Sequence, residues 1–157
     1  MAKCLVGANG GGKVTVEGLS ADVVLAGNTI KVLQGAKEIL SVEGSAEFEF
    51  LGAGFRYSAF QSYNVGDTIQ RSNDFLNSVA VPSGAQASTS FTFKKDCSVK
   101  IFWKGTSQGS PTTLKLNGVN VESGQTYEAK AGQAISIYLG PYVGSLASVF
   151  YTIYKVG

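Results

Sequence analysis

Apolar and polar side chains alternate at successive positions along much of this 157-residue chain. In residues 46–50, for example, Phe48 and Phe50 alternate with Glu47 and Glu49. Successive side chains of a β-strand point to opposite faces of the sheet, so a period of two indicates strands with one buried face. No segment has the apolar spacing of a long amphipathic helix, and only residues 36–42 are compatible with a short one. The chain is therefore predicted to be all-β.

Glycine followed by a small or polar residue precedes such alternation three times, at residues 24–32, 63–69 and 129–137. Because glycine reaches positive φ without a Cβ clash, each copy predicts a turn that leads into a strand. Asn117-Gly118 lies between alternating apolar residues. This dipeptide predicts a hairpin with a type I′ turn, in which both central residues have positive φ.

The N-terminus is rich in glycine and is predicted to form an extended arm. Glycine has the most backbone entropy to lose, so the arm needs either the protein's own body or a neighbouring subunit to hold it in place. We take this as an indication of assembly. The residues of this candidate anchoring arm are Gly7, Asn9, Gly10, Gly11 and Gly12.

Residues 81–90 are small and polar and include one proline, which makes them the best candidate for a linker or long loop. We expect an arm at 1–12, an N-terminal β-region at 13–82 and a C-terminal β-sandwich at 83–157. The expected type is an antiparallel immunoglobulin-like or jelly-roll sandwich. One continuous sandwich is the alternative architecture.

Charged residues make up 15% of the chain, which is below the usual quarter, and apolar residues make up 44%. A monomer normally needs more charge to stay soluble, so this composition favours a protein that covers part of its surface with neighbours. The net charge of +2 gives no indication of a nucleic-acid partner. The sequence shows neither a signal-peptide core nor an apolar run of the roughly 18 residues that a membrane span needs. We expect synthesis in a cytoplasm and no membrane insertion.

Three motifs resemble sites of chemistry, but two lack a required part and the third has a simpler structural interpretation. Residues 7–14 approach a phosphate-binding loop, but Val14 has no hydroxyl for magnesium and the next residues alternate like a strand. Residues 105–109 match G-x-S-x-G, but the chain has no histidine to act as the base. Glu47 and Glu49 lie two apart and are typical of a solvated strand face rather than of a glycosidase pair. We predict no catalytic residue, no cofactor and no metal site.

The two cysteines, Cys4 and Cys97, make neither a disulfide framework nor a zinc site, and Cys97 is expected to be a small buried hydrophobe. Four lysines near two aromatic residues raise the alternative of a basic surface for single-stranded nucleic acid. A solvated face beside a core Trp103 is the preferred interpretation, so no nucleic-acid partner is expected. The residues concerned are Lys94, Lys95, Lys100, Lys104, Phe102 and Trp103.

Aromatic residues crowd the C-terminus, and flat amphipathic rings suit sugar faces and protein interfaces alike. The last predicted strand, 148–156, is apolar on both faces. Such a strand is either central in a sandwich or pressed against another chain. The candidate contact residues for an oligomer or a ligand are Tyr138, Tyr142, Phe150 and Tyr154.

Segments 91–100, 114–119 and 127–135 succeed one another as a strand, Asp96-Cys97, a strand, an Asn-Gly hairpin and an Ala-Gly turn before a late strand. This succession resembles small β-sandwich domains in fibre, tip and decoration proteins of tailed bacteriophages. Gln133-Ala134 departs from the acidic-Thr pair that is more usual there, and this departure affects the turn more than the fold.

The resemblance implies a non-enzymatic virion structural protein that is exposed as a fibre, decoration or host-adhesion module. It also implies other virion proteins as partners, a homo-oligomer with a trimer favoured, and a host surface glycan as a further candidate partner. The arm would then anchor the protein in the particle. A free carbohydrate-binding module is the alternative function.

Overall fold

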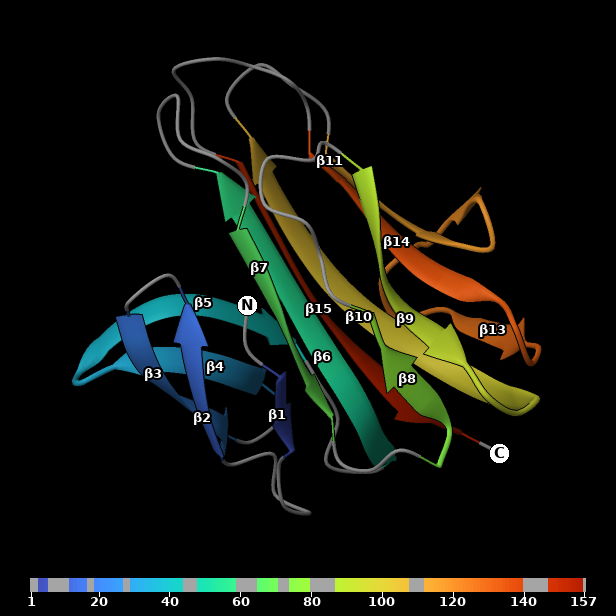
Figure 1. The fold of residues 1–157 in the computed structure, drawn as a ribbon, viewed down its shortest axis with the longest axis horizontal. Coiled ribbons are helices and arrows are strands. Elements are labelled where there is room, and N and C mark those ends of the chain that lie inside the picture. The colour runs from blue at the N-terminus through green and yellow to red at the C-terminus, as the bar shows by residue number, and fades with distance from the viewer. Residues whose placement is uncertain are drawn as a thin grey trace.

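The structure, a computed structural model, is all-β, and the residues it describes contain no helix, as predicted. Its strands form three sheets of six, five and four strands (Figure 1). The described residues are 3–5, 12–16, 19–26, 29–43, 48–58, 65–70, 74–79, 87–107, 112–139 and 147–156.

The six-stranded sheet has the strand order β1-β7-β6-β15-β10-β13. Strand β15 lies at its centre and is antiparallel to both neighbours, β6 and β10. Strand β1 lies at one edge and runs parallel to β7. The strands are β1 (Lys3–Leu5), β6 (Glu49–Ser58), β7 (Val65–Gln70), β10 (Cys97–Ser107), β13 (Thr126–Ala129) and β15 (Ala147–Lys155).

The other two sheets are antiparallel, with the orders β12-β11-β14-β9-β8 and β2-β3-β4-β5. The five-stranded sheet contains β8 (Leu76–Ser78), β9 (Ala87–Phe93), β11 (Thr112–Leu116), β12 (Val119–Asn120) and β14 (Ala134–Leu139). The four-stranded sheet contains β2 (Gly12–Val16), β3 (Leu19–Ala26), β4 (Thr29–Gln34) and β5 (Lys37–Glu43).

The boundary expected at residue 82 does not separate two sheets. Strands β6 and β7 come from the expected N-terminal region, yet they share the six-stranded sheet with β10, β13 and β15. Of the candidate arm, Gly12 begins β2, and the other four residues lie outside the described part of the chain. Those four are Gly7, Asn9, Gly10 and Gly11.

The turn predictions are confirmed at Asn117-Gly118 and at Gly132, whereas Gly27-Asn28 of the first copy lies outside the described residues. Asn117 and Gly118 have φ of 51° and 78° in the β11–β12 hairpin, and Gly132 has φ of 88° in the turn before β14. The prediction fails at Gly66-Asp67, because both residues lie inside β7 and pair with β6. The short helix considered for residues 36–42 is also wrong. Gly35, at φ 61°, closes a turn that returns this segment as β5.

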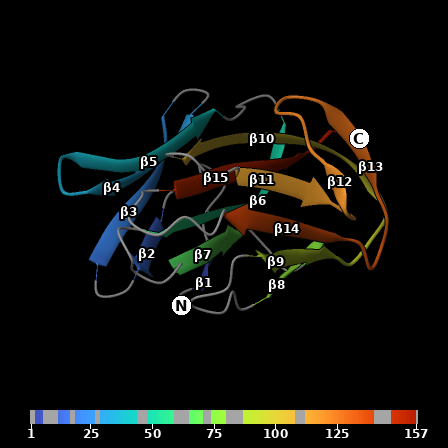
Figure 2. The same cartoon turned by 90° about the horizontal axis from the view of Figure 1, so that it is seen from above.

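The six- and five-stranded sheets pack face to face over a shared apolar core (Figures 1 and 2). On β15, the side chains of Val149, Tyr151 and Ile153 belong to this core. Phe150 and Tyr154 alternate with them and are also buried, because β5 lies against β10 and β15 on the far side of the sheet. The last strand is therefore central, one of the two positions that its sequence allows.

Aromatic rings fill the face of β15 that is turned away from the shared core. Tyr154 makes edge-to-face contacts with Phe50 and Phe102, at centroid distances of 5.7 and 5.9 Å. Such contacts stabilise a pair by about 0.5–1.5 kcal/mol beyond the burial of its surface. Both faces of this strand are thus held by packing within the chain.

Tyr151 on the core face lies directly over Gly54 of β6, its register partner. A Cβ atom at position 54 would collide with the hydroxyl oxygen and Cζ of Tyr151, so the close approach requires glycine. The hydroxyl of Tyr151 is hydrogen-bonded to Ser90 Oγ, and this oxygen also donates to the carbonyl of Ile135 at 3.4 Å. Ser90 lies at an irregularity where β9 and β14 shift register, and among the described residues it is the hydrogen-bond partner of the buried phenol.

We predict that Ser90→Ala lowers the free energy of unfolding by about 1–3 kcal/mol, because it leaves the buried phenol of Tyr151 without its serine partner. The double variant Ser90→Ala/Tyr151→Phe should recover part of this loss, since both polar groups are then removed. Urea denaturation of the native chain, Ser90→Ala, Tyr151→Phe and the double variant measures the coupling. Losses that simply add would show that the two hydroxyls do not stabilise the fold as a pair.

Candidate interaction surface

The structure separates the four candidate contact residues. Phe150 and Tyr154 are 1% and 0% exposed, so they do not present a surface to a partner, and their interpretation as contact residues is corrected. Tyr142 lies outside the described residues. Tyr138 of β14 is partly exposed and remains a candidate.

Tyr138 belongs to the side of the five-stranded sheet that faces away from the core. Alternation along β14 turns Ile135 and Ile137 inward, where they are buried, and turns Ser136 and Tyr138 outward. Register partners extend this pattern to β9, β8 and β11. We call the resulting surface the outer face; its residues are Asn77, Thr89, Thr92, Thr113, Lys115, Ser136 and Tyr138.

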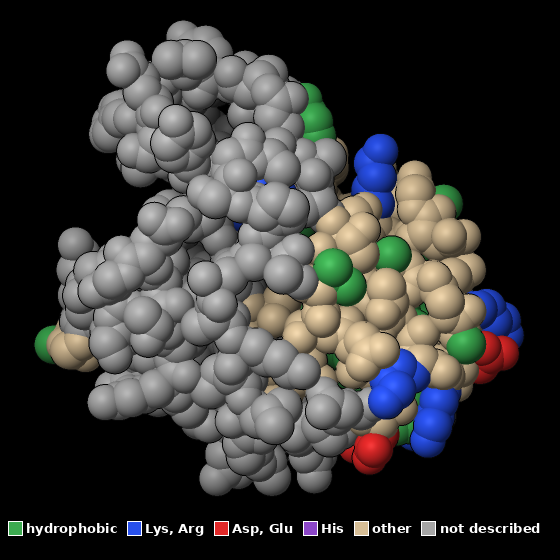
Figure 3. All heavy atoms as spheres, in the orientation of Figure 1, with side chains coloured by type: hydrophobic (Ala, Val, Ile, Leu, Met, Phe, Trp, Pro, Cys, Tyr) green, Lys and Arg blue, Asp and Glu red, His purple; other side chains and the backbone are tan. Residues whose placement is uncertain are grey.

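The outer face is polar and almost free of charge. Ser136 lies between Lys115 on β11 and Thr89 on β9, and Tyr138 pairs with Thr113. Lys115 is the one ionic member of the set. Over β8, β9 and β14, Figure 3 shows mostly uncharged polar side chains and backbone, with the charged side chains chiefly toward the margin. A partner that covered this surface would strip water from few ions, so the cost of desolvation is low.

The buried residues behind the outer face hold it in a fixed shape. Leu114 and Leu116 alternate with Thr113 and Lys115 on β11 and are buried in the core. On β9, Phe91 and Phe93 lie on either side of Thr92 and are also buried in the core. Closely packed interiors keep side chains in defined positions, so the backbone that carries the outer face needs no ordering on binding.

Tyr138 also lies near the end of the sheet from which several connections leave. It is one residue from the end of β14, and Leu139 pairs with Thr112, the first residue of β11. In the six-stranded sheet, Ala147 pairs with both Ser58 and Ser107, so three strand ends also meet there. This end of the molecule is opposite to the turns that carry the resemblance.

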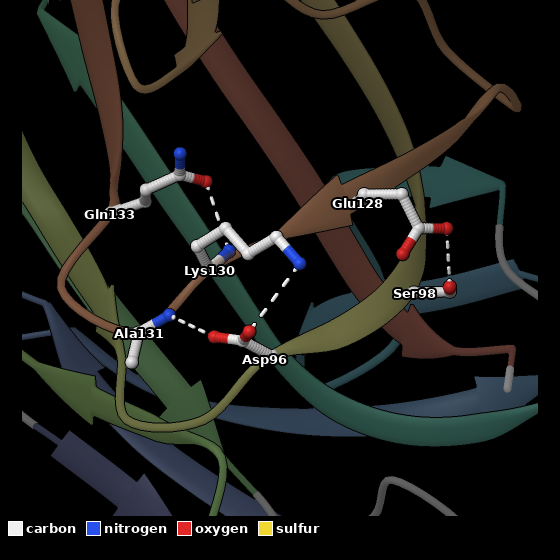
Figure 4. Close-up of polar contacts among 6 residues, drawn as sticks. All are labelled: Asp96, Ser98, Glu128, Lys130, Ala131 and Gln133. Atoms are coloured by element: carbon white, nitrogen blue, oxygen red, sulfur yellow. Dashed lines mark hydrogen bonds and ion pairs between the residues drawn. The ribbon is translucent and has the colours of Figure 1, made fainter.

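Those turns form one connected cluster (Figure 4). Asp96 lies in the turn between β9 and β10 and accepts a hydrogen bond from the backbone N–H of Ala131 at 2.9 Å. Its carboxylate also forms an ion pair with the ammonium of Lys130 at 3.4 Å. Ala131 and Lys130 belong to the turn between β13 and β14. Because each turn crosses between the two packed sheets, Asp96 ties one crossing to the other. The role of the Asp96-Cys97 motif is therefore structural.

Gln133 fills the position where the resemblance expects an acidic residue. Its side-chain Oε1 accepts a hydrogen bond from the backbone N–H of Lys130 at 3.0 Å, so an amide closes the turn. The backbone of Phe93 adds two bonds, since its N–H donates to Gln133 and its carbonyl accepts from Gly132, both at 2.8 Å. On the adjacent strands, Ser98 Oγ donates to Glu128 Oε1 at 2.5 Å. The departure from the acidic pattern thus leaves the turn closed.

The lysines considered for nucleic-acid binding do not share one aromatic surface. Trp103 packs against the core and its Nε1 donates to the carbonyl of Val121 at 2.7 Å, whereas Phe102 lies on the opposite face of β10 with Tyr154. The ammonium of Lys100 lies 5.3 Å from the ring of Phe48, and that of Lys95 lies 5.4 Å from the ring of Phe75. The preferred interpretation, a Trp103 packed on the core beside solvated lysines, agrees with this arrangement.

Cys97 is 8% exposed and belongs to the core, as predicted. Burial raises the pKa of its thiol, and Lys155 partly opposes this effect. Glu49 is exposed, and Glu47 lies outside the described residues. No group of three or more His, Cys, Asp or Glu that could hold a metal ion occurs in the described part of the chain. Nor does that part include a helix with the length and apolar character needed to cross a membrane.

Buried polar residues are the feature that the sequence analysis missed. Arg56 on β6 is 0% exposed, and burial lowers the pKa of its guanidinium. Gln70 on β7 is equally buried, and its Nε2 donates to the carbonyl of Leu76 at 3.3 Å. Arginine and glutamine are usually exposed, so composition gives no warning of this. The one signal in the sequence is the spacing of Arg56, which lies two and four residues after Gly54 and Gly52 and so belongs to the same face of the strand. In the structure all three residues pair with β7.

Comparison with protein-family models, with curated proteins and with solved structures finds no match to this chain.

We predict that Asp96 stabilises the fold in a pH-dependent way. The backbone N–H of Ala131, followed by Lys130, lowers the pKa of Asp96 below its ordinary value of 3.8. The carboxylate therefore contributes its full stabilisation above pH 3.8, and the contribution disappears as the pH falls through the lower pKa of the folded state. The difference in urea midpoint between the native chain and Asp96→Ala should be largest near neutrality and shrink in acid.

Asp96→Asn is the matched control, because it retains an oxygen that can accept from Ala131 but carries no titrating charge. Its stability relative to Asp96→Ala should not change over the same acid range. A native chain that keeps its full advantage over Asp96→Ala below the folded pKa would contradict the assigned cause.

Proposed function

We propose that this protein is a non-enzymatic virion structural protein, exposed on the particle as a fibre, decoration or host-adhesion module. It works through subunit packing and surface contact, as a homo-oligomer with a trimer favoured. The two packed sheets then correspond to a sandwich of immunoglobulin-like or jelly-roll type, with the glycine-rich N-terminus as the anchoring arm. The placement in a virion draws on the resemblance of residues 91–135 to such modules.

The outer face is the observation that carries the proposal. Four hydroxyl side chains and one tyrosine lie on the outer face of the five-stranded sheet with a single lysine among them. Tyrosine and small polar residues also dominate the contact surfaces of antibodies, because they supply area and hydrogen bonds at a low cost in side-chain entropy. The hydroxyl residues are Thr89, Thr92, Thr113 and Ser136, and the tyrosine is Tyr138.

The same surface favours a second candidate function, a free carbohydrate-binding module. A partly exposed Tyr138 supplies a flat ring for a sugar face, and the neighbouring hydroxyl of Thr113 supplies a hydrogen-bonding group. Binding of a glycan by a monomer that shows no self-association would favour this function over the virion module.

Immunogold electron microscopy tests the placement in a virion. Antibodies raised against the folded chain should label particles whose genome encodes it, at one repeated position on each particle. Mass spectrometry of purified particles gives an independent count of the chain. If the chain is absent from particles and unlabelled by antibody, the proposed function is wrong.

We predict that Ser136→Lys weakens self-association, because it places a second ammonium directly across from Lys115 on the outer face. Covering two like charges costs several kcal/mol, so the association constant should fall by roughly a hundredfold or more. The added cost to folding is about 0.2–1 kcal/mol, because the pair is on a solvated sheet surface. Light scattering at micromolar concentration measures the association.

Thr126→Lys is the matched control, since it places a lysine across from Lys100 on the six-stranded sheet, away from the outer face. It should fold with a similar penalty and associate like the native chain. Equal effects of the two substitutions, or an effect of Thr126→Lys alone, would rule out the outer face as the contact.

A further inference from the structure

Strand β1 has an unusual attachment to the rest of the fold. It forms three register pairs, Lys3 with Thr68, Cys4 with Ile69 and Leu5 with Gln70, and all of them are with β7. It lies at the edge of the six-stranded sheet, so its other side pairs with no strand of that sheet. A three-residue edge strand contributes few hydrogen bonds, and its release costs correspondingly little.

The edge that β1 covers is nevertheless important to the sheet. Without β1, the outer backbone groups of β7 would be unpaired, and an open strand edge is a template for another chain. Thr68 and Gln70 on β7 are buried at 4% and 0% exposure, so this strand is part of the packed structure. The backbone groups at the β7 edge therefore need a partner strand, and β1 is that strand.

At the opposite edge of the same sheet, β10 is covered by β13 and by the segment that precedes it. Strand β13 pairs with β10 only from Cys97 to Lys100. Beyond that point the segment after β12 takes over, with the N–H of Gly124 donating to Ile101 at 2.8 Å and the N–H of Trp103 donating to Ser123 at 2.9 Å. Only the β7 edge depends on a short strand that is remote in sequence.

The connection between β1 and β2 is six residues long. These residues, 6–11, separate Leu5 from Gly12, and three of them are glycine. Fully extended, this connection spans about 25 Å. Strands β1 and β2 nevertheless approach within 8 Å between Cα atoms. The connection is thus long enough for β1 to reach beyond its own sheet.

We propose that β1 exchanges between copies, so that the β7 edge of one subunit is covered by β1 of a second copy of this chain. The same three register pairs form within one subunit or between two, so the strand contacts are equal in the two states. Only the path of the connection differs, and a higher protein concentration then favours exchange. The proposal is independent of the virion function, since it requires nothing but two copies of the chain.

A mixing experiment tests exchange through a disulfide that only two different copies can form. One copy carries Cys97→Ala and keeps Cys4. The other carries Cys4→Ala, Ile69→Cys and Cys97→Ala, with an affinity tag that gives it a different mass. Register partners on neighbouring strands lie about 4.8 Å apart, which suits a disulfide. The two copies are refolded together at high concentration, oxidised and separated on a non-reducing gel.

The expected result is a heterodimer band, at least roughly tenfold stronger than the dimer bands of either copy refolded alone, because register holds the two thiols at a high effective concentration. Mass spectrometry should identify the peptide pair that contains positions 4 and 69. If the mixture gives no more dimer than the separate copies, the proposal is overturned.

A second variant, Ile69→Cys with Cys97→Ala, carries both thiols in one chain and shows whether β1 lies beside β7 at all. At high dilution it should form a disulfide within the monomer, and circular dichroism checks that it remains folded. A monomer disulfide without heterodimer in the mixture leaves β1 fixed in its own subunit and contradicts exchange. Failure to form either disulfide in the folded proteins contradicts the pairing itself, and the proposal with it. Neither failure affects the immunogold test of the virion function.

Discussion

The burial of β15 on both faces is the constraint on which the rest of the structure depends. A strand with Val149, Tyr151 and Ile153 on one side and Phe150 and Tyr154 on the other must be covered twice. The five-stranded sheet covers one side and β5 lies against the other. Its neighbours β6 and β10 come from distant parts of the sequence, so the centre of the fold forms only when long-range pairing is complete.

Much of the local structure could be predicted because the deciding interactions are local. The Asn117-Gly118 turn depends on φ values that those two residues adopt readily, and the burial of Cys97 follows from alternation along its own strand. Gly66 and Arg56 could not be placed this way. Gly66 lies within a strand because it pairs with β6, and Arg56 is buried because the register places it opposite Val149. Such tertiary pairing is not visible in a short window of sequence.

The low charge of the chain has a structural source within the subunit. The five-stranded sheet covers one face of the six-stranded sheet and β5 lies against β10 and β15 on the other, so these central strands have little need of ionic side chains. Composition alone could not distinguish this internal covering from covering by neighbours. Composition also could not show which aromatic residues near the C-terminus are buried and which are exposed. Phe150 and Tyr154 pack inside, and Tyr138 lies on the outer face, where one lysine is the only ionic member.

The edges of the two sheets that share the core show where assembly through backbone pairing is restricted. Strands β8, β12 and β13 are three, two and four residues long, and short edge strands give another chain little to pair with. Strand β1 is equally short, but it is the one edge strand that lies parallel to its neighbour and enters from a glycine-rich connection. The proposed exchange therefore involves one register on β7, whereas the proposed contact through side chains involves the outer face. The two surfaces lie on different sheets, so a subunit can use both at once.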